Sequence, residues 1–130
     1  MKKLFLLLTV ICLFSCSKEN IPSISGIWTI VETNAEIGGG VQVQTYPPSS
    51  EVTMEFGANG QLILTGTNPG RAMSPLWDYD RYEVLPDQVI RFYKSFNGEE
   101  MKAFFTVEGD LFLNYLTVRC GYEEKFLRLK

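Results

Sequence analysis

Closely spaced acidic side chains are the residues of this chain whose types and spacing could do chemistry. Three pairs are candidates: Asp78 with Asp80, Glu99 with Glu100, and Glu123 with Glu124. Asp78 and Asp80 would share one face of a strand, where two carboxylates could hold calcium or act together in glycoside hydrolysis. A solvated strand face explains their spacing and requires nothing more, and we interpret the first pair in that way. We place the other two pairs in solvated turns, and we predict no metal site.

The sequence contains no histidine. This removes histidine-dependent catalytic triads, most zinc sites and the usual proton shuttle at neutral pH. The loop serines Ser49, Ser50 and Ser74 therefore have no such base to activate them. The glycines at 38–40 lack the lysine and the following helix of a phosphate-binding loop. We predict no catalytic residue, no enzyme activity and no cofactor.

A proline-bearing segment, residues 71–82, is the best candidate for binding. It carries the aromatic residues Trp77, Tyr79 and Tyr82, with Arg71 and Arg81 at its flanks. Aromatic rings beside arginines suit an amphipathic or carboxylate-bearing ligand. The alternative is that the rings fill a core beneath a flexible loop.

The N-terminal residues have the pattern of a secretory signal. Lys2 and Lys3 precede an apolar run from Leu4 to Phe14, and the small residue Ser15 follows. The run has 11 residues, whereas a transmembrane helix needs roughly 20. We therefore interpret residues 1–15 as a signal peptide and not as a membrane span.

The string Leu13-Phe14-Ser15-Cys16 resembles the lipobox of bacterial lipoproteins. The resemblance implies that Cys16 carries acyl chains such as palmitate, and two or three chains anchor a protein stably to a membrane. The alternative is an ordinary signal peptide with an incidental cysteine. The short segment Ser17-Lys18-Glu19 resembles the signals that send such lipoproteins to the cell surface. We therefore expect a lipid-anchored protein of the outer membrane, displayed at the cell surface.

Cleavage before Cys16 would change the charge balance of the chain. It removes two of the 12 basic residues and none of the 15 acidic ones, so the formal net charge moves from −3 to −5. A negative balance argues against a nucleic-acid partner, because such binding needs a basic stripe. Cys120 would remain as a single thiol, which we interpret as buried at a strand end, with a reactive thiol as the alternative.

After a tether at residues 16–25, the chain shows alternation and turn signals in place of helical spacing. Asn59-Gly60 and Asn97-Gly98 are strong hairpin signals. We predict about nine short strands, at 27–33, 41–45, 52–56, 62–65, 77–84, 89–93, 101–107, 111–118 and 125–129, with a glycine-rich break at 35–40. A row of hairpins leaves two exposed edges unless it closes. Residues 26–130 are therefore predicted to form one small, all-β, up-and-down antiparallel barrel of eight or nine strands.

The start of the first strand, Gly26-Ile27-Trp28, resembles the Gly-x-Trp of the lipocalin barrel. Residues 56–62, and residues 77–84 with the Pro-Asp turn after them, are similar to segments of lipocalin-like lipoproteins of the Bacteroidota. The resemblance covers roughly residues 24–130. It implies a lipocalin-like barrel in which Trp28 is a buried plug at the closed end.

Two predicted strands near the C-terminus are apolar on both faces. Phe104, Phe112 and Leu116 fall on the side that should meet water. Classical lipocalins cover such a surface with a helix after the last strand, for which this sequence has no counterpart. These residues are predicted to form an interface patch. It would be covered by a second copy, by another envelope protein or by the tether.

These features lead to two hypotheses about function. The first is a cell-envelope barrel that binds a small apolar or amphipathic ligand, with Trp77 and Tyr79 near the mouth. The alternative is a non-enzymatic interaction module with a solid-packed barrel that contacts another envelope protein.

Overall fold

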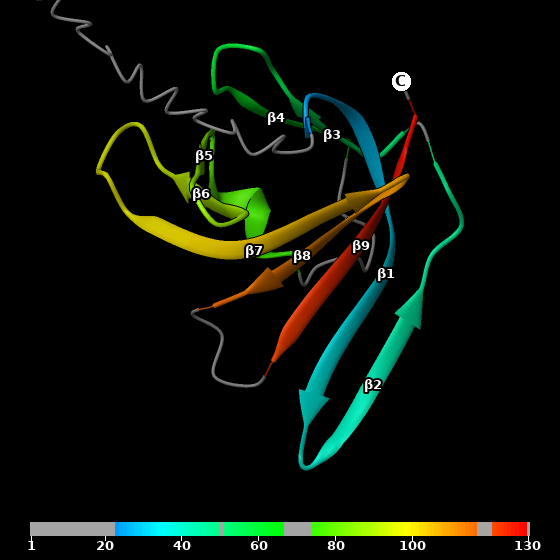
Figure 1. Cartoon of the computed structure of the whole chain (residues 1–130). Helices are drawn as coiled ribbons and strands as arrows, with labels where there is room; N and C mark the ends of the chain where they lie inside the picture. The colour runs from blue at the N-terminus through cyan, green and yellow to red at the C-terminus, as the bar shows by residue number, and fades with distance from the viewer. Residues whose placement is uncertain (1–22, 50, 67–73, 117–120, 130) are drawn as a thin grey trace, which may run out of the picture.

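The computed structural model describes residues 23–49, 51–66, 74–116 and 121–129. Nine strands and one short 3₁₀ helix lie in these residues (Figure 1). In chain order they are β1 (Gly26–Ile37), β2 (Gly40–Thr45), β3 (Thr53–Phe56), β4 (Leu62–Thr65), η1 (Pro75–Asp78), β5 (Arg81–Leu85), β6 (Val89–Tyr93), β7 (Glu100–Glu108), β8 (Asp110–Tyr115) and β9 (Tyr122–Arg128). The predicted all-β class is confirmed.

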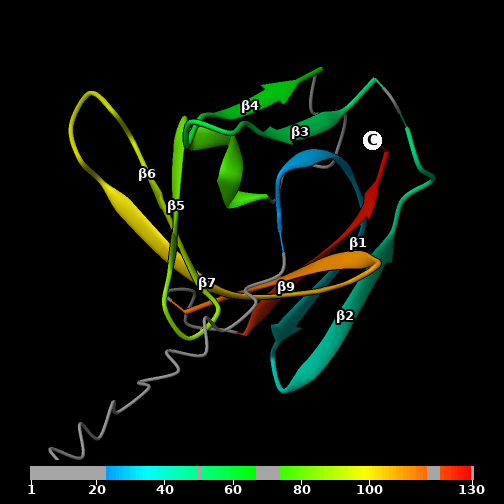
Figure 2. The same cartoon turned by 45° about the horizontal axis from the view of Figure 1, so that its top comes forward.

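The strands form one antiparallel sheet that curls into a nearly closed barrel. Its order is β4-β3-β1-β9-β8-β7-β6-β5, with β2 added to β1, so the first strand pairs with the last. The strands at the two ends of this order are β4 and β5. They meet where Gln61 forms an isolated β-bridge with Arg81. There the Leu62 amide donates to the Asp80 carbonyl at 3.0 Å, and the Tyr82 amide donates to the Gly60 carbonyl at 2.9 Å. Figure 2 shows the strands around η1, as predicted for an up-and-down barrel that removes its edges.

The first strand is longer than the sequence pattern predicted. We expected it to end near Thr33, before a break at 35–40, but β1 continues to Ile37. Gly38 and Gly39 alone make the turn, with φ of +62° and +81°, a geometry that glycine adopts without steric cost. The N-terminal half of β1 pairs with β3 and its C-terminal half with β2. The β1–β2 hairpin therefore extends away from the barrel (Figure 1).

The start of β5 also differs from the prediction of a strand at 77–84. Residues 75–78 form η1, and the strand begins at Arg81. Ser74 caps η1 by accepting a hydrogen bond from the Leu76 amide at 3.4 Å, and Pro75 occupies the first turn, where it is favoured. The fully buried side chain of Leu76 anchors η1 to the core.

The core is a single hydrophobic cluster supplied by the inward faces of the strands. Its largest fully buried side chains include Trp28, Phe56, Phe92 and Phe105. Trp28 donates from Nε1 to the Ile24 carbonyl at 2.9 Å. The Arg128 guanidinium lies 4.3 Å from the centre of the Trp28 ring. Trp28 thus has both its apolar ring and its polar nitrogen partnered, while its role as a plug remains a prediction.

Candidate functional site

Four of the residues predicted to bind a ligand lie in the described part of the chain, and their surroundings differ from one another. Cys16, Cys120 and Arg71 lie outside the described residues. Tyr82 is buried in the core, where its ring meets Phe56 edge-on at 5.0 Å and its hydroxyl donates to the Gly57 carbonyl at 2.6 Å. Tyr82 therefore takes part in core packing near the barrel seam, the alternative that we weighed for this segment.

The remaining members of the predicted segment have separate surroundings. Tyr79 is half-buried, with the Lys94 ammonium 5.6 Å from its ring centre. Burial raises the pKa of the Tyr79 hydroxyl, and the nearby Glu99 carboxylate adds to this shift. Arg81, at the start of β5, is half-buried. Trp77, on η1, lines a pocket.

The acidic pair at 78 and 80 does not share a strand face, because η1 ends at Asp78 and β5 begins after Asp80. Asp80 accepts hydrogen bonds from the Ser95 hydroxyl and, at 2.8 Å, from the Ser95 amide. These bonds hold the pKa of Asp80 below its usual value. Asp80 therefore ties β5 to the turn after β6. Within the described part of the chain, no three acidic or cysteine side chains gather as metal ligands would.

The pocket beside Trp77 is a narrow, mostly apolar space. It has a volume of about 20 Å³, roughly what one water molecule requires. Its lining residues come from the first strands, η1 and β9: Ile30, Val52, Thr53, Met54, Leu64, Ser74, Trp77 and Phe126. Thr53 and Ser74 are the polar residues of this lining, and Ser74 connects the space to a buried carboxylate.

That carboxylate belongs to Glu124, which is 0% exposed. We predicted Glu124 to lie in a solvated turn before a strand beginning at residue 125, and this prediction is wrong. β9 begins at Tyr122, so Tyr122, Glu124 and Phe126 all point inward. The alternation of these residues with Glu123 and Lys125 could have indicated a strand that begins at Tyr122, but it does not say which face of that strand is buried.

Three hydroxyl groups surround Glu124. Ser74 donates at 3.1 Å, Tyr122 donates at 3.3 Å, and Tyr115 also donates to the carboxylate. Tyr115 and Tyr122 are cross-strand partners whose ring centres lie 5.7 Å apart. The carboxylate thus links the residue before η1 to β8 and β9.

Burial governs the protonation of this cluster. It raises the pKa of Glu124 to about 7, although the three hydrogen bonds act in the opposite direction. Burial, together with the charge of Glu124, raises the pKa values of Tyr115 and Tyr122 as well. Glu124 can therefore exchange a proton near neutral pH while both tyrosines remain neutral.

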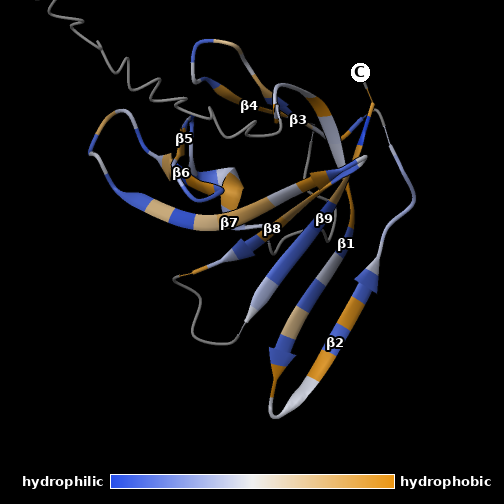
Figure 3. Ribbon diagram, viewed as in Figure 1, coloured by the Kyte–Doolittle hydropathy of each residue, from blue (hydrophilic) through white to orange (hydrophobic). Residues whose placement is uncertain are grey.

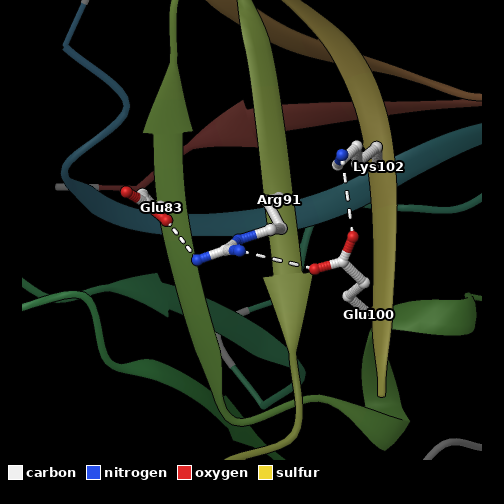
Figure 4. Close-up of polar contacts among 4 residues, drawn as sticks. All are labelled: Glu83, Arg91, Glu100 and Lys102. Carbon is white, nitrogen blue, oxygen red and sulfur yellow. Dashed lines mark hydrogen bonds and ion pairs between the residues drawn. The ribbon is translucent and has the colours of Figure 1, made fainter. Parts of the chain in front are cut away.

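The outer face of the barrel has a charged part and an apolar part. The charged part lies on β5, β6 and β7. Arg91 on β6 forms ion pairs with Glu83 on β5 and, at 3.4 Å, with Glu100 on β7. Lys102 on β7 lies 3.6 Å from Glu100 (Figure 4). Further along β7, Phe104 is 48% exposed, and Leu116 after β8 is 47% exposed. Phe112 is half-buried, with the Lys125 ammonium 5.5 Å from its ring centre.

A groove runs through the apolar part of this face. It has a volume of about 220 Å³ and is lined by Phe104, Phe105, Thr106, Phe112, Asn114 and Glu123. Phe105 is 1% exposed and belongs to the core. We call the other five residues together with Leu116 the outer patch. Of the three residues that the sequence suggested as an interface, Phe104 and Phe112 line the same groove, and Leu116 is not among its lining residues. None of the three is fully buried by the barrel's own strands. Their role as an interface stays a prediction.

Comparisons with protein families, with curated proteins and with solved structures found no match for this chain. The class of protein is therefore defined by the fold alone: a small, nearly closed barrel of antiparallel strands in up-and-down order. No helix in the described ranges is long and apolar enough to cross a bilayer.

Proposed function

We propose that this barrel is a non-enzymatic protein-interaction module of the cell envelope, and that the outer patch is its contact surface. The observation that carries the proposal is the groove of about 220 Å³ flanked by partly exposed aromatic side chains. Apolar surface gathered in one place and bordered by polar groups is typical of interaction sites. Asn114, Glu123 and Lys125 supply the polar border.

The inward faces of the strands support this proposal. Their aromatic and aliphatic side chains form one buried cluster, and the pocket beside Trp77 has room for about one water molecule. The outer groove, with a volume of about 220 Å³, has more room for a side chain of a partner than the pocket beside Trp77. The envelope location rests on the signal-like residues 1–15 and on the proposed lipidation of Cys16. A partner would then be another envelope protein, or a second copy.

Site-specific photo-crosslinking tests the proposal in the source cells. A photoreactive residue at position 104 should give one discrete adduct, and the same residue at the exposed Ser95, in the turn after β6, should not. Phe104→Asp combined with a photoreactive residue at position 112 should abolish the adduct. Ile63→Asp, at an exposed apolar residue of β4 outside the outer patch, should leave it unchanged. Equal labelling from positions 104 and 95 would contradict the proposal.

A second candidate function is the binding of a small apolar or amphipathic ligand by a lipocalin-like barrel. The pocket beside Trp77 favours it, because its walls are mostly apolar and the Ser74 hydroxyl at its lining bonds to the buried Glu124. A ligand larger than water would have to displace η1 or its flanking residues. Native mass spectrometry of the purified protein distinguishes the two functions. A co-purified mass of lipid size that Trp77→Ala removes supports ligand binding, and a ligand-free mass supports the interaction module.

A further inference from the structure

We propose that β2 is a self-complementary sheet edge at which two copies of this chain pair, β2 against β2 and antiparallel, to form one continuous sheet. This inference goes beyond the proposed function, because β2 lies on the projecting hairpin and contributes no residue to the outer patch. It rests on backbone register, side-chain alternation and charge.

The register of the hairpin determines which backbone groups face the free edge. Among the described strands, β2 pairs with β1 alone. The Tyr46 amide donates to the Val31 carbonyl at 2.8 Å. Since hydrogen-bonded positions alternate in an antiparallel pair, Gln44 and Gln42 also direct their backbone groups toward β1. Val41, Val43 and Thr45 then direct their N–H and C=O groups away from β1, toward the free edge.

This edge lacks the features with which proteins usually prevent edge pairing. Such features are charged side chains, proline within the strand, and bulges. Residues 38–50 contain no charged side chain, and both prolines of the segment follow the strand. The pairing of β2 with β1 shows no register shift. All six residues of β2 are exposed, including Val41 at 67% and Val43 at 60%.

The side chains of β2 match a second β2 in antiparallel orientation. Hydrophobic and hydrophilic residues alternate along the strand (Figure 3). A two-fold axis through Val43 places each Val43 opposite its symmetry mate and each Val41 opposite Thr45. The same axis places Gln42 opposite Gln44 on the other face. β-branched residues then meet on one face and amides on the other, with about six new backbone hydrogen bonds across the edge.

Charge favours a second copy over a charged peptide as the occupant. The whole chain carries a formal net charge of −3, so two copies repel each other at most surfaces. The uncharged β2 edge allows them to approach without bringing like charges into contact. A six-residue strand buries far less than the roughly 800 Å² per partner of a standard interface. We therefore expect a weak dimer that forms reversibly as concentration rises.

Sedimentation velocity of the full chain in mild detergent, from micromolar to millimolar concentration, tests the inference. Wild type should pass from monomer to dimer, and Val43→Ala should do the same because it keeps the edge N–H. Val43→Pro removes an N–H that does not bond to β1, so the barrel should still fold while dimerisation weakens by more than about tenfold. Circular dichroism checks that each variant is folded.

Two further variants make the test specific to register and surface. Val43→Lys places two like charges face to face, so its dimer should be lost at low salt and partly recovered at high salt. Phe104→Asp, in the outer patch, should leave the dimer intact. A wild-type chain that stays monomeric, or a dimer abolished by Phe104→Asp and unaffected by Val43→Pro, would overturn the inference. The latter result would leave the outer patch as the contact surface.

Discussion

At the scale of single residues, Glu124 is the least expected feature of the molecule. Its fully buried carboxylate accepts hydrogen bonds from three hydroxyl groups, and no described cation contacts it. Hydroxyl donors satisfy the oxygen atoms, but they do not neutralise a charge in a poorly solvated site. The cluster is therefore most stable when Glu124 carries a proton.

We predict that this residue makes stability fall as pH rises from about 4.5 to about 7, with little further change above that range. Burial raises the pKa of folded Glu124 to about 7 from the usual value of 4.5. Between these values the folded state binds more protons than the unfolded state, so the free energy of unfolding must decrease with rising pH. The contribution reaches roughly 3 kcal/mol at most. Urea melts between pH 5 and pH 8 should show the decline.

Matched variants assign this pH dependence to one side chain. Glu124→Gln should flatten the decline, because an amide keeps the shape of the side chain and does not titrate. Glu123→Gln, on the outward face of the same strand, should preserve the decline. If both variants retain the wild-type slope, Glu124 is not its source.

Trp28 should be among the most costly side chains to truncate. It is 0% exposed, bonds to the Ile24 carbonyl and lies beneath the Arg128 guanidinium. Trp28→Ala should lower the free energy of unfolding by about 3–5 kcal/mol, as large aromatic truncations in cores do. Trp28→Phe, which keeps a ring but loses the indole N–H, should cost less. A loss below about 1 kcal/mol for Trp28→Ala in urea melts would contradict a role as a core plug.

At the scale of elements, the seam between β4 and β5 is the weakest part of the barrel wall. A single bridge and two backbone hydrogen bonds join the β3–β4 turn to the start of β5. The other neighbouring strands pair over three to seven positions. Closure therefore depends on how closely Gly60 approaches Tyr82.

Gly60→Ala should weaken this seam. Gly60 has a φ of +77°, and a Cβ atom there would lie 2.9 Å from the Tyr82 carbonyl oxygen. Gly98 is a matched control, because its φ is +73° and a Cβ there would meet nothing within 4 Å. Gly98→Ala should cost about 1–2 kcal/mol for backbone strain alone. Gly60→Ala should cost at least about 1 kcal/mol more, through the loss of seam hydrogen bonds.

Hydrogen exchange provides an independent measurement for the seam. The amides of Leu62 and Tyr82, which donate across it, should exchange faster in Gly60→Ala and at the wild-type rate in Gly98→Ala. Equal losses of stability in the two variants would mean that the seam tolerates the added methyl group.

At the scale of the whole molecule, the barrel and its proposed anchor have separate roles. The barrel should fold without the lipid, because its core is formed by residues of the described strands, by Ile24 and by η1. Cys16→Ser should therefore yield an unprocessed or soluble precursor with the circular dichroism of a β protein. Detergent phase separation measures the change, and normal membrane partitioning of the variant would contradict lipidation at Cys16.

The sequence alone determined the strands, most of the turns and the closed up-and-down order. These features depend on local properties: alternation with a period of two, and turn residues such as Gly60 that adopt positive φ. Local rules also explain the error at residues 77–80. Alternating aromatic residues predicted a strand there, but Ser74 and Pro75 favour the start of a helical turn.

Only the tertiary structure decided which strand face is buried and how far each strand continues beyond the barrel. Residues 122–128 alternate, but a period of two does not identify the inward face; pairing with β1 and β8 places Glu124 inside. Similarly, hydrophobic and polar residues alternate along β2, and this pattern would also be expected of a strand in the barrel itself. β2 lies outside the barrel because β1 is long enough to pair with β3 in one half and with β2 in the other. Burial and exposure arise from contacts between residues far apart in the chain, which local spacing does not encode.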